Sequence, residues 1–230
     1  MSTRTADFEQ PLSGWFTHLA WNIDLRLRGP FVLHSDERAP LRARLAALVA
    51  QLVREEGVHT AHALEMTVIP PLPGGPRCDL ALLMHSTQPL TDALTERTTE
   101  LGLTDPELAL TARNTGRIGD TEARDGEILL NHFAGTHPKG TGEATAEATD
   151  AWKAVSTWYL EKLGVDNSTL LGYEPEAPFL IMNYARLPGG VMPFLAGQLL
   201  RPSFYGTVRR TLHDAGLTPF PVFARRVPRV

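Results

Sequence analysis

The stretch "RTTELGLTDPELALTAR" at residues 97–113 matches "RTLHDAGLTPFPVFAR" at residues 210–225, and this match decides the fold. Each stretch joins the end of a helical segment to Gly-Leu-Thr, a proline, an apolar run and a final Ala-Arg. Similarity between distant parts of one chain is the signature of an internal repeat. The sequence therefore predicts two copies of one supersecondary unit.

The segments outside this pair occur in the same order in both copies. "LVREEGV" at 52–58 corresponds to "YLEKLGV" at 159–165, and each predicts a helix closed by a left-handed glycine, Gly57 or Gly164. Hydrophobic patterns predict strands at 15–27, 59–69 and 78–86 in the first copy and at 126–135, 168–174 and 178–187 in the second. They predict helices at 37–56 and 89–102 in the first copy and at 147–163 and 202–216 in the second. A closing strand follows the second helix of each copy. The candidate helix caps are Ser35 or Asp36 and Thr145 or Thr149.

Each copy thus has the order β-α-β-β-α-β, which is the ferredoxin-like arrangement. We predict an α+β fold in which two tandem ferredoxin-like repeats, residues 14–113 and 126–230, pack their antiparallel sheets into a barrel with helices outside. The polar segment "NTGRIGDTEARD" at 114–125 is the expected linker.

Composition limits the class of protein and partner. The chain has 230 residues, enough for one large or two small domains, and its net charge of -4 argues against a nucleic-acid partner. The single cysteine, Cys78, excludes an intramolecular disulfide. Because no window approaches the roughly 20 apolar residues of a membrane span and no apolar leader is present, we expect a cytoplasmic protein without a membrane partner.

A glycine-rich segment at 134–142 resembles a phosphate-binding loop only in part. Gly135 and Gly140 have the required spacing, but Thr141 stands where the lysine should be, and Lys139 precedes the second glycine. We interpret the segment as the turn after the first strand of the second copy.

Polar side chains on the predicted strands are the candidate site residues. Glu65 is the most suggestive, because a carboxylate buried in a strand would have a raised pKa and could act as a base. Asn183 and Arg186 have opposite parity, so they cannot face the same side of a regular strand. The predicted catalytic residues are Glu65, His85, His132 and Arg186, and the predicted substrate-binding residues are His18, Trp21, Asn131, Asn183, Met192 and Phe194.

The insertion at 188–201 has no counterpart in the first copy, and three interpretations are equally open: a lid over a pocket, a dimer contact or additional core. His59 and His62 point to opposite faces of a strand, and no other set has the spacing of metal ligands, so we expect no metal and no cofactor. A single histidine that ligates haem leaves no spacing signature, so haem held by His132, His85 or His213 is the alternative.

By element order and repeat, residues 14–227 resemble the fused, two-repeat form of the dimeric α+β barrel superfamily. The resemblance implies relatives among cofactor-independent oxygenases and cyclases of aromatic metabolites, and among haem enzymes of the chlorite dismutase and dye-decolourising peroxidase type. "CDLALLMHSTQPLTDAL" at 78–94 is similar to a strand and helix of chlorite-dismutase-like proteins, whereas the peroxidase pattern G-x-x-D-G is absent.

From these observations we expect an enzyme that acts on a small, largely apolar or aromatic metabolite in a pocket between sheet and helices. It would be a monooxygenase-like oxidoreductase or a cyclase. The alternatives are a haem-binding enzyme with one histidine ligand and a non-catalytic binding or assembly protein, and a homo-oligomer is compatible with each.

Overall fold

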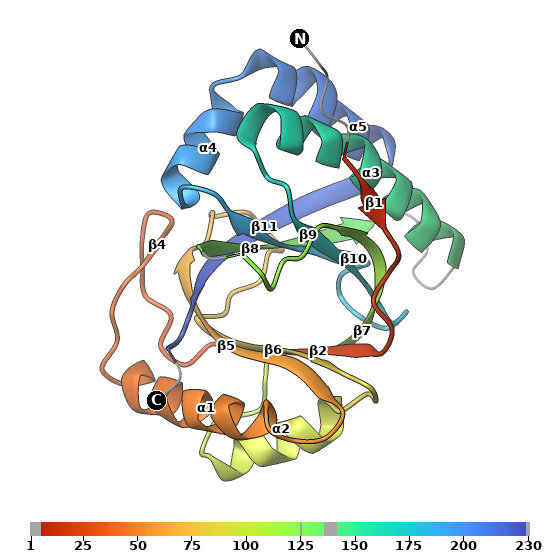
Figure 1. Ribbon diagram of the computed structural model, residues 1–230. Coiled ribbons are helices and arrows are strands. Elements are labelled where there is room, and N and C mark those ends of the chain that lie inside the picture. Colours follow the sequence, from red (N-terminus) through yellow and green to blue (C-terminus); the bar gives the residue numbers. More distant parts are fainter. Residues whose placement is uncertain (1–5, 125, 136–141, 229–230) are drawn as a thin grey trace. The chain divides into compact units, whose positions relative to one another are not determined.

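The computed structural model describes residues 6–124, 126–135 and 142–228, which form two compact units (Figure 1). The first unit contains Ser13–Arg113 and the described residues from Val222 onward. The second unit contains the described residues up to Leu12 and from Asn114 to Pro221. Each unit therefore holds one sequence repeat and is completed by a segment from the far end of the chain.

The first unit is an antiparallel sheet with two helices on one face (Figure 1). Its strands are β2 (Trp15–Trp21), β5 (Val58–Val68), β6 (Leu80–Ser86) and β7 (Leu108–Ile118), in the order β7, β2, β6, β5, and its helices are α1 (Arg38–Leu52) and α2 (Thr91–Glu100). Two short strands, β3 (Leu27–Arg28) and β4 (Phe31–Val32), extend the sheet beyond β5. The last part of β11 (Leu217–Arg226) also pairs with β5, with Arg225 opposite Glu65.

Alternating strand residues form the core of the first unit. Leu19 and Trp21 of β2 and Leu82 of β6 pack against Leu45 and Leu52 of α1. These side chains are fully buried, and burial of a large apolar side chain contributes about 1.5–3 kcal/mol. The hydrophobic alternation of the strands therefore selects the face that the helices cover.

The second unit repeats this plan with additional helices. Its strands are β8 (Glu127–Gly135), β9 (Ser168–Tyr173), β10 (Ile181–Leu187) and the first part of β11, in the order β11, β8, β10, β9, β7, and β1 (Phe8–Glu9) pairs with the end of β7. The helices are α3 (Gly142–Leu163), α4 (Val191–Leu199), the π-helix η1 (Phe204–Arg209) and α5 (Arg210–Asp214). Trp152 and Trp158 of α3 pack over Phe133 and Ile181 of the sheet.

The structure confirms the predicted fold class: an α+β barrel fold built from two ferredoxin-like repeats. The left-handed glycines are also confirmed, since Gly57 and Gly164 have φ values of 81° and 68°. At Gly164 the amide of the next residue, Val165, donates to the carbonyl of Tyr159 (3.3 Å), which closes α3 as a capping motif requires.

Several predicted boundaries were wrong. The first strand ends at Trp21, because the Asp79 carboxylate accepts the amides of Ile23 and Asp24 (3.0 Å each) and turns the chain away. Ser35 does accept the Arg38 amide at the start of α1.

Two further differences concern the second half of the chain. Thr145 and Thr149 lie inside α3, which begins at Gly142, so neither is its cap. β7 continues to Ile118, so the expected linker at 114–125 starts as strand. The insertion at 188–201 contains α4, and most of the glycine-rich segment around Lys139 lies outside the described residues.

Two glycines of the second unit provide a matched test of the backbone. Gly119 (φ 54°) and Gly164 (φ 68°) are both left-handed, but a Cβ on Gly119 would lie 2.6 Å from the carbonyl oxygen of Asp166, whereas one on Gly164 meets nothing within 4 Å. We expect Gly164→Ala to lower the free energy of unfolding by about 1 kcal/mol and Gly119→Ala by roughly 3 kcal/mol, because only the latter adds a steric clash. Urea unfolding measures both, and equal losses would contradict the structure.

Candidate functional site: a polar cavity in the second unit

The second unit contains a cavity between its sheet and its helices. The cavity has a volume of about 40 Å³, which is room for one or two water molecules. Its walls combine apolar and aromatic side chains with amides and hydroxyls, and the polar lining consists of Asn131, Ser156, Tyr159, Asn167, Ser168 and Asn183. Apolar walls with a few converging polar groups are typical of small-molecule sites.

Asn183 of β10 is the most firmly held polar side chain of the cavity. Its Oδ1 accepts hydrogen bonds from the indole Nε1 of Trp152 (3.0 Å) and from the hydroxyl of Ser168. Two donors use both lone pairs of this oxygen, so the orientation of the amide is fixed. The Nδ2 group makes no hydrogen bond to another described residue and remains a donor for a ligand.

Asn131 of β8 lies directly opposite Asn183 in the antiparallel register and lines the same cavity. Its Oδ1 is buried and has no hydrogen-bond donor among the described residues. A buried acceptor without a donor costs about 1–3 kcal/mol. The two amides therefore place a free donor and an unsatisfied acceptor on neighbouring strands, an arrangement that suits a ligand with adjacent carbonyl and hydroxyl groups.

Trp152 reaches Asn183 because the sheet makes room for its ring. A Cβ on Gly116 of β7 would lie 2.7 Å from Cζ3 of Trp152, so only glycine allows this approach. The ring of Phe8 contacts Trp152 edge-on, with 5.7 Å between centroids. Gly116 lies in the segment that the sequence predicted as a linker, so the pattern gave no sign of this role.

α4 forms another wall of the cavity. Phe194 stacks on Tyr159 of α3 at a centroid distance of 5.8 Å, and burial raises the pKa of Tyr159. The Glu127 carboxylate accepts the amide of Val191 (2.7 Å) at the first turn of α4, where a negative charge is favourable. The Tyr159 hydroxyl donates to the side chain of Gln198 (3.2 Å), so α4 is attached to α3 as well as to the sheet.

The structure brings three of the predicted site residues together at this cavity: Asn131, Asn183 and Phe194. Met192 is on the outer side of α4 and is 57% exposed. Trp152, Ser168 and Tyr159 are not among the residues predicted from the sequence. For Trp152 and Tyr159 the only signal was their place on the apolar side of a predicted helix.

Arg186 and His132 lie on the opposite face of the same sheet. Arg186 donates through Nη2 to the hydroxyl of Tyr184 (3.0 Å), which in turn donates to the Glu122 carboxylate (3.0 Å). His132 stacks on Tyr173 and contacts Phe179. The regular register of β8 and β10 confirms that Asn183 and Arg186 point to different sides.

The remaining predicted residues belong to the first unit. Trp21 is buried in the core beneath the helices and donates through Nε1 to the carbonyl of Thr104 (3.0 Å). His85 stacks on Phe16, and its Nε2 is 2.7 Å from the carbonyl oxygen of Ser13. His18, on the same face as Phe16, is also buried, and burial lowers its pKa to about 4.

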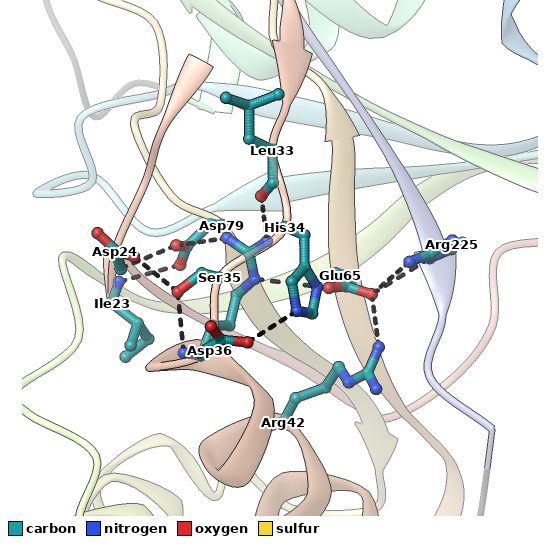
Figure 2. A network of polar contacts seen from close by, with 11 residues as sticks. Ile23, Asp24, Leu33, His34, Ser35, Asp36, Arg42, Glu65, Asp79 and Arg225 are labelled. Carbon is teal, nitrogen blue, oxygen red and sulfur yellow. Dashed lines mark hydrogen bonds and ion pairs between the residues drawn. The ribbon is translucent and has the colours of Figure 1, made fainter. Parts of the chain in front are cut away.

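Glu65 is the centre of an ion-pair network in the first unit (Figure 2). Its carboxylate contacts Arg38 (3.5 Å) and Arg42 (3.1 Å) of α1 and Arg225 of β11 (2.9 Å). Arg38 in turn pairs with the buried Asp79 (2.9 Å). The network therefore joins β5, α1, the final strand and the residue that precedes β6.

The expectation of a raised pKa at Glu65 was wrong in direction. Burial alone would raise this pKa, but the hydrogen bonds and charges of Arg225 and Arg42 together outweigh it, so the pKa lies below the usual 4.5. Glu65 also faces α1, on the side of the sheet that the helices cover. We infer a structural carboxylate here, since three arginines hold it ionised and a base must accept a proton.

Among its described lining residues, the second-unit cavity has no side chain suited to ligate a metal or haem iron. No group of three or more histidine, cysteine, aspartate or glutamate side chains converges anywhere in the described part of the chain. The cavity lining contains no histidine, cysteine or methionine, and the raised pKa of Tyr159 opposes a phenolate ligand. Of the haem-ligand candidates, His132 faces away from the cavity, His85 contacts a carbonyl, and the side chain of His213 is 90% exposed.

Comparison with solved structures finds several proteins that share this fold. An anthrone oxidase-like protein superposes with a TM-score of 0.56 at 11% identity, covering 99% of this chain and 94% of the other. A provisionally assigned chlorite dismutase has a TM-score of 0.55 at 10% identity, with 95% and 96% coverage. A provisionally assigned monooxygenase from Fusobacterium nucleatum subsp. nucleatum has a TM-score of 0.53 at 9% identity, with 94% coverage of each chain.

At these identities the likeness concerns the fold alone. No family model matches the sequence, and no curated protein matches it.

The Glu65 network allows a test of stability. We expect Glu65→Gln to lower the free energy of unfolding by about 2–3 kcal/mol, because it leaves the buried Arg38 without one of its two carboxylates. Glu55→Gln is the matched control, since Glu55 forms a partly exposed pair with Arg97 (2.9 Å) and should matter by less than about 0.5 kcal/mol. Chemical denaturation measures the free energy of unfolding of both variants, and equal losses would refute the structural role of Glu65.

His18 predicts a pH dependence. The unfolded chain binds a proton at His18 below pH 6.5, but the folded chain does so only below about 4, so stability is lost as the pH falls through this window. Between pH 6.5 and pH 5 the loss is about 2 kcal/mol at roughly 1.4 kcal/mol per pH unit. We expect His18→Gln to lack this part of the pH dependence and the exposed-site control His213→Gln to keep it, as measured by urea unfolding at pH 7 and pH 5.

Proposed function

We propose that this protein is an oxidoreductase-type enzyme that binds a small aromatic molecule with hydroxyl and carbonyl groups in the second-unit cavity. The observation that carries this proposal is the Asn183 amide, which lines a largely apolar cavity and is fixed by two donors on Oδ1, while Nδ2 makes no hydrogen bond to another described residue. The unsatisfied Oδ1 of Asn131 supplies the complementary acceptor. The fold shared with an anthrone oxidase-like protein and a provisionally assigned monooxygenase supports the reaction class.

The lining suits a reaction that needs no ionisable catalytic residue. Tyr159 is the one lining side chain that can titrate, and its raised pKa keeps it protonated. We propose that the substrate loses its CH₂ proton to water and binds as the enolate, and that Asn183 stabilises the negative charge on its oxygen through Nδ2, as fixed donors do in an oxyanion hole. Asn131 would accept a hydrogen bond from the neighbouring hydroxyl through Oδ1 and hold the ring in register.

For an anthrone-like substrate the reaction balances with molecular oxygen as the only co-reactant. The activated CH₂ carbon beside the aromatic rings reacts with O₂, loses both hydrogens and becomes a carbonyl. One oxygen atom enters the product and the other leaves as water with those two hydrogens. The substrate is oxidised to a quinone and dioxygen is fully reduced.

A complete aromatic substrate needs more room than the described cavity offers, because small-molecule pockets usually measure about 300 Å³ or more. α4 is the wall best placed to move, since it follows two left-handed glycines, Gly189 and Gly190. Its displacement would carry Phe194 off Tyr159 and join the cavity to solvent. This assigns the insertion the role of a lid, one of the three roles considered from sequence.

Oxygen uptake with 1,8-dihydroxyanthrone, with product formation followed by absorbance, tests the proposal. We expect turnover by the metal-free protein, and a loss of about 100-fold or more in kcat/KM for Asn183→Leu, which removes the donor and keeps the side-chain volume. Trp152→Phe keeps an aromatic ring but removes the hydrogen bond to Oδ1 of Asn183. We expect its kcat/KM to fall roughly tenfold and its stability to change less than that of Asn183→Leu. Asn22→Leu, at an exposed turn of the first unit, is the control and should retain full activity.

Two results would contradict the proposal. One is wild-type activity in Asn183→Leu, which would place the reaction elsewhere. The other is a haemin titration that produces a Soret band at one equivalent and is abolished by replacement of a single histidine. That result would establish the haem alternative.

A further inference from the structure

α4 is apolar on both of its sides, although only one side is buried. Val191 and Phe194 pack inward, whereas Met192, Leu199 and Leu200 are 57%, 48% and 81% exposed. Positions 192, 199 and 200 share one face at helical spacing. Tyr205 of η1 adjoins this face, because its hydroxyl donates to the carbonyl of Leu199 (3.1 Å), and it is 46% exposed. We call Met192, Leu199, Leu200 and Tyr205 the α4 patch.

The charged side chains within the segment that carries the α4 patch are all of one sign. Residues 188–213 contain Arg201, Arg209 and Arg210 but no aspartate or glutamate, although the whole chain has a net charge of -4. The Arg209 guanidinium lies over the Tyr205 ring at 5.8 Å, so a positive group borders the patch directly. Arg210 pairs with Asp214 (3.6 Å), whereas no ion pair joins Arg201 or Arg209 to an acidic side chain among the described residues.

These charges favour one kind of partner over another. A second copy docked through the same patch would bring each arginine near its own symmetry mates, because a two-fold interface presents the same surface twice. Like charges across an interface are unfavourable. An anionic lipid surface instead accepts apolar side chains into its interfacial layer and attracts arginines to its headgroup phosphates.

We propose that the α4 patch docks on the surface of an anionic lipid bilayer. Surface docking needs no membrane-spanning segment, and no described helix has the length and apolar character to span a bilayer. The proposal thus revises the expectation of a protein without a membrane partner, which rested on the lack of a spanning window and of an apolar leader. It does not depend on the chemistry of the cavity.

Co-sedimentation of the full chain with phosphatidylcholine vesicles, with and without phosphatidylglycerol, tests this proposal. We expect binding only to the phosphatidylglycerol vesicles, and weaker binding as salt is raised. Leu199→Glu with Leu200→Glu should lower the affinity at least tenfold, and Arg201→Gln with Arg209→Gln roughly 25-fold, at about fivefold for each charge. Leu72→Glu, at another exposed leucine, is the matched control and should bind like the wild type.

Circular dichroism and thermal melts establish that each variant is folded before its binding is compared. The proposal is overturned if the wild type fails to bind phosphatidylglycerol vesicles, or if it binds both vesicle types equally. It is also overturned if sedimentation shows a dimer that Leu200→Glu dissociates while vesicle binding is absent, since the patch would then bind a second copy.

Discussion

The two-residue period of the β-strand is the constraint on which the rest of this structure depends. Neighbouring residues must face opposite sides of a sheet, and helices cover one side in each unit. Polar residues that stand close in sequence are therefore separated. Asn183 faces the cavity under α3, whereas Arg186, three positions later, joins Tyr184 on the other side. The same rule places Asn131 with Asn183, because direct partners on paired antiparallel strands share a face.

The fold could be predicted because its signals are local and occur twice. Both repeats show the same order of apolar periods, and the left-handed glycines mark equivalent joints with positive φ. Boundaries failed where side chains from other elements decide them. β2 ends at Trp21 because Asp79, distant in sequence, accepts the amides that a longer strand would have used. α3 begins before Thr145, although threonine is a good capping residue.

The candidate site was predictable only in part. The two asparagines were predicted together with His132 and Arg186 of the opposite face, because parity could not show which face the helices cover. For the same reason Glu65 was assigned the wrong surroundings. Its pKa is set by Arg225, 160 residues away, and by Arg42 one helix away. The role of Gly116 could not be predicted either. In the sequence, a glycine that makes room for an indole ring cannot be distinguished from a glycine in a turn. Such contacts depend on which segments pack together.

α4 connects the proposed chemistry to the proposed surface. Its inner side chain Phe194 lines the cavity, and its outer side chains Met192 and Leu200 are exposed on the opposite side of the same short helix. A force on the outer face must therefore move the cavity wall, since nine residues leave no room for independent halves. A bilayer that draws the outer face into its interfacial layer would loosen the contact between Phe194 and Tyr159. The cavity would then widen at the bilayer surface, and its volume of about 40 Å³ would correspond to the closed state of this coupling.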